Sequence, residues 1–288
     1  MSTHGPGLIA VTGATGAIGG RVATLLAGRG VPQRLVVRDP GRAPQLDGAE
    51  TAVASYDEPA AMRAAFAGVD TLLLVSAAEH PDLVRQHIAA VDAAAAAGVR
   101  RVVYTSFLGA APDATFTLAR HHWVTEQRLR ASGVAFTFLR DSLYLDFLPF
   151  MAGEAGVIRG PAGDGRVAPV ARADVSDVAT AVLLDGSGAH DGQTYDVTGS
   201  ALRTMAEWAT ELSAAAGRAV RYQEETVEEA WASRAVYGAP DWEVEGWITS
   251  YLAVAVGELA VATDVVERVA GHPPRELADL VGPDAPGR

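Results

Sequence analysis

The stretch GLIAVTGATGAIG, residues 7–19, decides the fold of this chain. Its apolar run from Leu8 to Val11 predicts a buried strand, and the glycines that follow predict a tight turn. A helical pattern, IGGRVATLLAGRG at residues 18–30, comes directly afterwards. This order predicts a phosphate-binding turn, because the start of a helix offers unpaired N–H groups and a positive dipole end to an anion.

Three glycines in this turn, Gly13, Gly16 and Gly19, follow the pattern G-x-x-G-x-x-G. Glycine lets the backbone turn tightly and approach a pyrophosphate closely, and at Gly19 it lets the helix pack against the sheet. The pattern alone is weak, and its alternative is a structural glycine-rich turn. Its position between a first strand and a helix favours dinucleotide binding.

Strands and helices alternate through the first half of the chain. The apolar runs in QRLVVRD, DTLLLVS and RRVVYTS are typical of parallel strands that helices cover on both faces. We therefore expect an α/β fold with a Rossmann-type doubly wound parallel sheet. This dinucleotide-binding domain is predicted to span residues 1–140, and residues 168–198 are expected to return to it.

The pattern changes after residue 140. Residues 149–169 are rich in Gly and Pro and are expected to form an irregular crossing segment, whereas helices are expected to dominate from Thr204 on. We predict a smaller, mostly helical substrate-binding domain at residues 141–288. It is expected to close over the carboxyl ends of the strands, where ligands bind in open α/β sheets.

The composition excludes several classes of function. Lys and Arg total 23 against 35 Asp and Glu, and a net charge of −12 disfavours nucleic acids and anionic membrane surfaces. The chain has no Cys, which excludes disulfides and thiolate chemistry, and no cluster of metal ligands is evident. MSTHGPG is not a secretory signal, and Trp247 to Ala262 is too short for a membrane span. We expect a cytoplasmic protein with a small-molecule substrate, and a homo-oligomer is left open.

The end of the second strand, VVRDPGR, bears on the choice of cofactor. NAD sites place an acidic residue here for the ribose 2′-hydroxyl, whereas NADP sites place an Arg nearby for the 2′-phosphate. Arg38 comes first after the strand and Arg42 follows in the turn. A planar guanidinium suits a phosphate, so NADP(H) is favoured over NAD(H). In the alternative, Asp39 binds the ribose and Arg38 is a solvated loop residue.

Small and hydroxyl residues follow two later strands. Ser76-Ala77-Ala78 comes after LLLV, and Thr105-Ser106-Phe107 comes after VVY. Such residues let a dinucleotide lie across the sheet, although each one alone is equally consistent with ordinary turn chemistry.

Together these motifs resemble the NmrA-like, atypical short-chain dehydrogenase/reductase family. Within that family the chain is especially similar to type-2 NAD(P)H:quinone oxidoreductases and triphenylmethane reductases. The resemblance covers nearly the whole chain, as far as GHPPRELA at residues 271–278. It is carried by GATGAIG, RDP, DTLLLVSAAE, VVYTS, HHWVTEQRLRASGVAFTFLRDSLY and VARAD.

The resemblance implies an NADPH-dependent oxidoreductase and a role for individual residues. Arg38 would hold the 2′-phosphate, and Arg172 would touch either ligand. Asp141, Ser142 and Tyr144 would border the nicotinamide and the substrate. The pyrophosphate and the middle of the cofactor would be bound by Gly13, Ala14, Thr15, Gly16, Ala17, Ile18, Ser76, Ala77 and Ala78.

Three segments depart from the pattern of the wider family. The Tyr-x-x-x-Lys pair is replaced by Leu118 and His122, although the Glu that follows it is kept as Glu126. His also occupies the Lys position in the quinone-reductase subgroup, so the resemblance does not imply an inactive protein. The nicotinamide segment usually begins with Asn-Gly, and here it is Asp141-Ser142. On the adenine side, Ser55 stands where Asp is usual and Tyr56 follows it.

The missing pair restricts the chemistry. Reduction of a simple carbonyl leaves a strongly basic alkoxide that needs a positioned proton donor. Reduction of a quinone leaves a delocalised hydroquinone anion that water can protonate, so orientation supplies most of the rate. The sequence thus argues against an alcohol dehydrogenase and for hydride transfer to quinones, dyes or conjugated enones. A non-catalytic NADP(H)-binding redox sensor is the alternative.

Four side chains are candidates for a role in catalysis or substrate binding. His122 is either a proton donor or ribose contact, or a packed helix histidine. Tyr144 is either a proton donor or, as we favour, an aromatic wall for a flat substrate. Phe107 would line an apolar substrate pocket with other aromatic residues, or belong to the core. Glu126, one helical turn after His122, would orient that histidine or be a solvated surface residue.

Overall fold

A seven-stranded sheet dominates the fold of the computed structural model, which describes residues 7–77 and 79–281. The strand order is β3-β2-β1-β4-β5-β6-β9. The sheet is parallel and Rossmann-like, which confirms the predicted fold class. The strands are β1 (Ile9–Thr12), β2 (Gln33–Val37), β3 (Ala49–Val53), β4 (Thr71–Leu74), β5 (Arg101–Phe107), β6 (Ala135–Asp141) and β9 (Thr194–Val197).

The strand order places β1 beside both β2 and β4. Ile9 pairs with Gln33 on one side and with Thr71 on the other. The chain therefore leaves β1 in one direction and later returns to its other side, so the carboxyl end of β1 is the topological switch point. In open α/β sheets this is where nucleotides bind.

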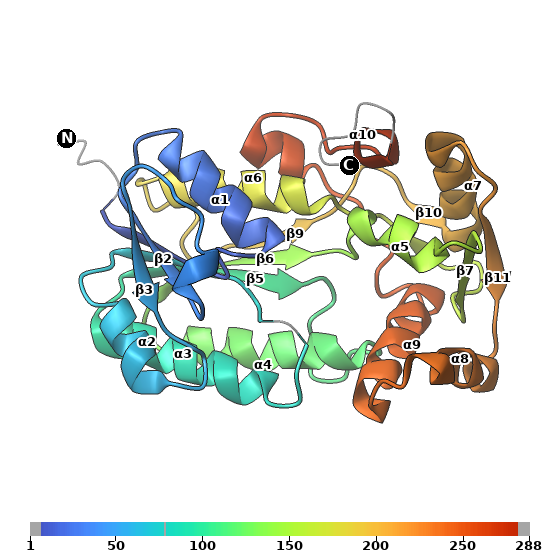
Figure 1. The fold of residues 1–288 in the computed structure, drawn as a ribbon, viewed down its shortest axis with the longest axis horizontal. Coiled ribbons are helices and arrows are strands. Elements are labelled where there is room, and N and C mark those ends of the chain that lie inside the picture. The colour runs from blue at the N-terminus through green and yellow to red at the C-terminus, as the bar shows by residue number, and fades with distance from the viewer. Residues whose placement is uncertain (1–6, 78, 282–288) are drawn as a thin grey trace. The chain divides into compact units, whose positions relative to one another are not determined.

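Helices cover both faces of this sheet (Figure 1). The two on one face are α1 (Ala17–Ala27) and α6 (Arg172–Leu184), and on the other face lie α2 (Pro59–Ala65), α3 (Leu83–Ala97) and α4 (Thr117–Ala131). Helix α3 ends at Gly98, whose φ of +80° favours glycine because it has no Cβ. All four residues of β1 and of β4 are buried, as a sheet covered on both faces requires.

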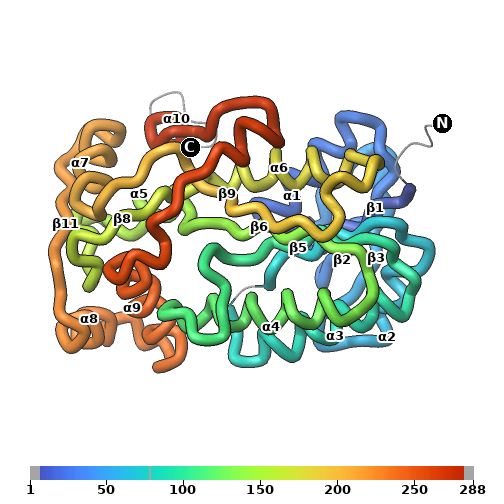
Figure 2. The backbone as a smooth tube through the Cα atoms, turned by 180° about the vertical axis from the view of Figure 1, so that it is seen from behind, coloured from blue at the N-terminus to red at the C-terminus, as the bar shows by residue number. Residues whose placement is uncertain are grey.

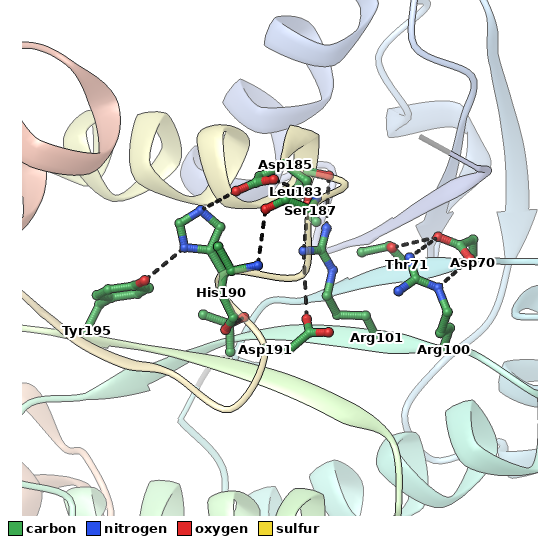
Figure 3. A network of polar contacts seen from close by, with 12 residues as sticks. Asp70, Thr71, Arg100, Arg101, Leu183, Asp185, Ser187, His190, Asp191 and Tyr195 are labelled. Carbon is green, nitrogen blue, oxygen red and sulfur yellow. Dashed lines mark hydrogen bonds and ion pairs between the residues drawn. The ribbon is translucent and has the colours of Figure 1, made fainter. Parts of the chain in front are cut away.

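A buried cation fixes the amino end of β5 (Figure 3). Arg101, which is 2% exposed, donates to the carbonyl oxygens of Leu183 and Asp185 at 3.1 and 3.0 Å. These carbonyls belong to the C-terminal end of α6, where a helix presents unpaired acceptors and negative partial charge. Arg101 thus ties α6 to β5 at the edge of the sheet opposite the carboxyl ends.

The chain divides into two compact units. Unit 1 contains the chain up to Ser106, His121–Arg140 and Val175–Tyr195, and unit 2 contains the rest. The core of unit 1 includes Phe66, Leu72, Tyr104 and Phe138, all of them fully buried. Residues 107–120 thus fall in unit 2, although they precede residue 140.

Unit 2 is mixed rather than helical throughout. The expectation that residues 149–169 are irregular is wrong, because β7 (Val157–Gly160) pairs in parallel with β11 (Arg221–Glu224) and β8 (Arg166–Val167) pairs antiparallel with β10 (Arg203–Thr204). Figure 1 labels β7, β10 and β11, and Figure 2 labels β8. Ile158, fully buried in β7, explains why this short segment is ordered. The elements of unit 2 include α5 (Leu148–Ala152), β7 (Val157–Gly160), β8 (Arg166–Val167), β10 (Arg203–Thr204), α7 (Met205–Ala216), β11 (Arg221–Glu224), α8 (Val227–Arg234), α9 (Asp241–Ala255) and α10 (Leu277–Val281).

The core of unit 2 forms around α7 and α9. Trp208 of α7 is buried and its indole N–H donates to the Val167 carbonyl at 3.1 Å. Gly160 lies against the ring of Tyr251, where an added Cβ would come within 2.4 Å of that ring. None of the helices in the described part of the chain is long and apolar enough to cross a membrane.

Candidate active site

The glycine turn joins β1 to α1 in the predicted manner. Gly13 has a φ of +62°, and its carbonyl accepts from the Gly16 N–H at 2.9 Å. Gly16 is the N-cap of α1 and supplies no capping side chain. The first N–H groups of the helix are therefore left without a side-chain cap, as an anion site at a helix start requires. Thr15, Gly16 and Ala17 are exposed, and Ala14 and Ile18 are buried.

Two glycines of the turn face different surroundings. An added Cβ at Gly19 would lie 2.4 Å from the Gly13 carbonyl oxygen, which leaves no room for a side chain. At Gly16 the nearest atom would be the same oxygen at 3.3 Å, and φ is −95°. Gly19 is thus needed for packing, whereas a small side chain could be built at Gly16 without breaking the fold.

The two candidate cofactor residues after β2 differ in their partners. The Asp39 carboxylate accepts from the Gly41 N–H at 2.9 Å and caps the short turn Pro40–Arg42. Arg38 is exposed and forms no ion pair with any residue in the described part of the chain. The carboxylate is therefore engaged in local structure, while the guanidinium is available to a ligand.

The segment after β4 is held by its backbone. Three successive N–H groups each donate to a buried side chain, one from β1, one from β5 and one from α3. The bonds are Val75 N to Thr12 Oγ1 at 2.9 Å, Ser76 N to Thr105 Oγ1 at 2.8 Å and Ala77 N to His87 Nε2 at 3.1 Å. The backbone at residues 75–77, which we name the strap, is thereby fixed before any ligand binds. Ala78 lies outside the described residues.

Tyr56, in the turn after β3, closes the same network. Its phenol oxygen lies 2.8 Å from both Thr12 Oγ1 and the Val75 carbonyl oxygen. Burial raises the pKa of Tyr56 to about 12, so the phenol keeps its proton at neutral pH. Tyr56 therefore joins the ends of β1 and β4.

A group of neutral polar side chains adjoins the strap through His87. His87 Nε2 accepts from Ala77, so its proton is on Nδ1, which lies 3.1 Å from Thr125 Oγ1. The Tyr104 phenol lies 2.9 Å from Nδ1 of His122. Burial lowers the pKa of His87 to about 4 and that of His122 to about 3. Both imidazoles are therefore neutral, and in the tautomer in which His122 Nδ1 accepts from the Tyr104 phenol, the proton of His122 is on Nε2.

Glu126 has neither of its two expected roles. It is 0% exposed, and its carboxylate accepts from Ser106 Oγ at 2.7 Å and from two nitrogens of Arg140 at 2.8 and 2.7 Å. It is thus not a solvated surface residue, and these partners rather than His122 occupy its oxygens. The bonds tie α4 to the ends of β5 and β6.

Three of the predicted residues meet in unit 2. Asp141 ends β6 and Ser142 follows it, and both are 1% exposed. The Tyr144 phenol lies 3.0 Å from Asp141 Oδ2. Asp141 Oδ1 and Ser142 Oγ have no hydrogen-bond partner among the described residues. Burial raises the pKa of Asp141 well above its usual range.

Arg172 and Phe107 have structural partners in unit 2. Arg172 Nε lies 3.1 Å from an Asp146 carboxylate oxygen, and its guanidinium lies 5.2 Å from the centre of the Phe147 ring. Phe107 packs edge-on against Phe116 with ring centres 4.8 Å apart. Phe147 is 46% exposed and therefore does not belong to the core.

Four residues of unit 1 were not predicted to have a role. Thr12 and Tyr104 are polar residues in otherwise apolar buried strands, and this was the available signal for them. The signal for His87 was a lone polar residue on an apolar helix face. None of these signals identifies the partner across the sheet. The four are Thr12, Tyr56, His87 and Tyr104.

The comparison with known families agrees with the glycine turn and the sheet. The model of the NAD(P)H-binding family matches residues 13–186. The chain belongs to the NAD(P)H-binding family. This match begins at the first glycine of the turn and includes the strap.

Members and relatives of this family are similar over their whole length. An NAD(P)H azoreductase of Xenophilus azovorans is 34% identical over 278 residues, which cover 95% of this chain and 96% of the relative. A (4-alkanoyl-5-oxo-2,5-dihydrofuran-3-yl)methyl phosphate reductase of Streptomyces griseus is 37% identical over 279 residues, 94% and 96% of the two chains. The crystal structure of an Escherichia coli NADPH-dependent quinone oxidoreductase in complex with NADPH superposes with a TM-score of 0.86 at 33% identity, covering 95% and 98%. The resemblance to quinone reductases is confirmed.

Proposed function

We propose that this member of the NAD(P)H-binding family is an oxidoreductase that transfers hydride from NADPH to a quinone-like or other conjugated acceptor. The observation that carries the proposal is the whole-length similarity to three reductases whose names specify azo, quinone and unsaturated furanone chemistry. In each such acceptor the hydride enters a conjugated system, and the charge that it brings is delocalised.

The cofactor is bound by unit 1 in this proposal. The uncapped start of α1 takes the pyrophosphate, and the strap supports the middle of the dinucleotide. The exposed Arg38 takes the 2′-phosphate, because Asp39 is engaged with the Gly41 N–H and is less available to a ribose hydroxyl. When bound, the nicotinamide supplies the hydride.

His122 acts here as a neutral hydrogen-bond donor. Its Nδ1 accepts from the Tyr104 phenol, so its remaining N–H is on Nε2. With a pKa of about 3, it holds no second proton to give at neutral pH. A contact from Nε2 to a ribose hydroxyl fits this protonation state better than a role as general acid.

The acceptor is bound by residues of unit 2 in this proposal. Tyr144 and Phe147 offer aromatic surfaces with ring centres 5.8 Å apart, and both are partly exposed. A planar acceptor suits such surfaces because flat rings stack with little loss of conformational entropy. Arg172, which lies over Phe147 and pairs with Asp146, holds this group in place.

The test is NADPH consumption by the purified protein, with NADH alongside. The acceptors are a benzoquinone, a naphthoquinone, a triphenylmethane dye, an azo dye and an enone. Turnover with NADPH, faster than with NADH, supports the proposal, and Gly16→Val serves as a control that lacks the phosphate site. Tight NADP(H) binding with no turnover on any acceptor would overturn it in favour of a non-catalytic redox sensor.

A further inference from the structure

Asp141 is a buried carboxyl group with too few partners for an ion. It is 1% exposed, its Oδ2 lies 3.0 Å from the Tyr144 phenol, and its Oδ1 has no hydrogen-bond partner among the described residues. No cation is hydrogen-bonded or ion-paired to it in the part of the chain that the structure describes. A carboxylate without a paired charge is costly to bury, so such a group takes up a proton instead.

The backbone around Asp141 is fixed. Its carbonyl accepts from the Leu108 N–H at 2.9 Å, and the Ser142 N–H donates to the Val197 carbonyl at 3.0 Å. The side chain therefore cannot leave the apolar environment without disrupting the end of β6. Burial raises the pKa of Asp141 well above its usual range, in the direction that favours a protonated carboxyl.

A protonated Asp141 changes what the Tyr144 phenol can do. The Tyr144 phenol donates to Asp141 Oδ2 at 3.0 Å when the carboxyl is ionised, whereas a protonated carboxyl can instead donate to the phenol oxygen. The phenol hydrogen is then directed away from Asp141. Tyr144 is partly exposed, whereas Asp141 is not, so the phenol is the member of the pair that a ligand can reach.

We infer that Tyr144 is the catalytic proton donor and that protonated Asp141 is the positioning residue behind it, which supplies the acid that the enones among the proposed acceptors need. This inference rests on the proposed reductase function. An enone that accepts a hydride at its β-carbon becomes an enolate, which is more basic than a hydroquinone anion. It needs a positioned acid, which a quinone does not.

The proton that the acceptor gains comes from the Tyr144–Asp141 pair, and solvent replaces it. The enolate oxygen takes the phenol proton, so an O–H bond forms on the acceptor and the Tyr144 O–H bond breaks. The phenolate oxygen takes the proton of Asp141, and the carboxylate that remains recovers a proton from water. The enol product then rearranges to the saturated ketone, and NADPH supplies both electrons as hydride.

The other ionisable groups near this pair are also identified. Burial and then Asp141 raise the pKa of Tyr144 well above its usual range, while Arg172 lowers it and Asp146, 3.1 Å from Arg172, raises it further. Because Asp141 must be protonated to act, enone reduction should decrease as the pH rises through its raised pKa. Benzoquinone reduction should not follow this dependence.

The experiment compares 1,4-benzoquinone with 2-cyclohexenone, using the wild type, Asp141→Asn and Tyr144→Phe. We expect both variants to lose about 100-fold or more in kcat/KM on the enone, and to lose far less on the quinone than on the enone. The double variant should lose no more than either single one, because the residues act as a unit. Asp141→Asn should also lack the high-pH decrease of the enone reaction, which a purely structural change would not remove.

Several outcomes would overturn the inference. They are equal losses on both acceptors, no loss on the enone, or no enone turnover by a wild type that reduces benzoquinone. An infrared difference spectrum between wild type and Asp141→Asn tests the protonation of Asp141 separately from the proposed function. A protonated carboxyl band at pH 7 is expected whether or not any acceptor turns over, and its absence would contradict the inference. Failure of the wild type on every acceptor would instead refute the reductase function.

Discussion

The N–H of Ala77 donates to Nε2 of His87 at 3.1 Å, and this bond joins the strap to a fully buried imidazole of α3. A protonated imidazole cannot accept this bond, so the strap depends on a neutral His87. Burial, which lowers the pKa of His87 to about 4, keeps it neutral at physiological pH.

His87 should make stability depend on pH. The unfolded chain takes up a proton here as the pH falls below 6.5, whereas the folded chain does not until about pH 4. The unfolded state binds more protons in this window, so the free energy of unfolding falls across it, by roughly 3 kcal/mol from this group. His87→Gln, which keeps an acceptor but does not titrate, should flatten that decrease in urea unfolding measured from pH 7 to 4. The exposed His80→Gln should not, and identical slopes in both variants would refute this role.

Arg38→Ala should separate the two cofactors. Loss of a charge-assisted contact to a phosphate costs about 1.5–3 kcal/mol, so KM for NADPH should rise roughly 10- to 100-fold. KM for NADH, which has no 2′-phosphate, should change less than about threefold. Arg42→Ala, in the same exposed turn, is the matched control. Equal effects of Arg38→Ala on both cofactors would remove Arg38 from the phosphate site.

Gly16→Val and Gly19→Ala should fail in different ways. A side chain at Gly16 meets only the Gly13 carbonyl oxygen, at 3.3 Å, so the variant should fold while losing NADPH binding in calorimetry. A Cβ at Gly19 would lie 2.4 Å from that oxygen, so Gly19→Ala should lower the free energy of unfolding by about 3 kcal/mol. Unchanged NADPH affinity in Gly16→Val would contradict the phosphate-binding assignment.

The parts of the fold that follow local patterns could be predicted from sequence. The strand at Ile9–Thr12 and the helix after it lie within one short stretch, in which the apolar run and the glycines are read together. The strand at Val157–Gly160 was missed because its partner, Arg221–Glu224, lies more than 60 residues later. A run of four residues between glycines carries too little periodicity to predict a strand.

Roles that depend on a distant partner could not be predicted. In the sequence Glu126 looks like an ordinary polar residue of a helix. Only the fold brings Arg140 and Ser106 to its carboxylate. Asp141 was assigned to the cofactor by resemblance, but sequence gives no sign that its Oδ1 would be buried without a partner. Burial of a polar group depends on tertiary packing, which no local pattern encodes.

The buried pair Glu126–Arg140 should contribute strongly to stability. Glu126→Ala leaves the Arg140 guanidinium and the Ser106 hydroxyl without their acceptor, so the free energy of unfolding should fall by about 3 kcal/mol. Replacing both members of the pair with Leu should recover part of this loss, because no unpaired charge remains. The exposed pair Arg268–Asp264 is the control, and Asp264→Asn should cost less than about 0.5 kcal/mol in the same urea titration. Equal losses at the two sites would contradict the role of burial.

His122→Ala should slow quinone reduction only modestly. The residue is neutral above about pH 4, because burial lowers its pKa to about 3, so it cannot act as a cationic acid at pH 7. We expect kcat/KM for benzoquinone to fall less than about tenfold, the range for losing one neutral hydrogen bond. Tyr104→Phe, which removes the bond to Nδ1, should have an equal or smaller effect. The wild-type rate should show no titration near pH 6.5 that His122→Ala abolishes. Such a titration, or a loss of several orders of magnitude, would show that His122 donates a proton during turnover.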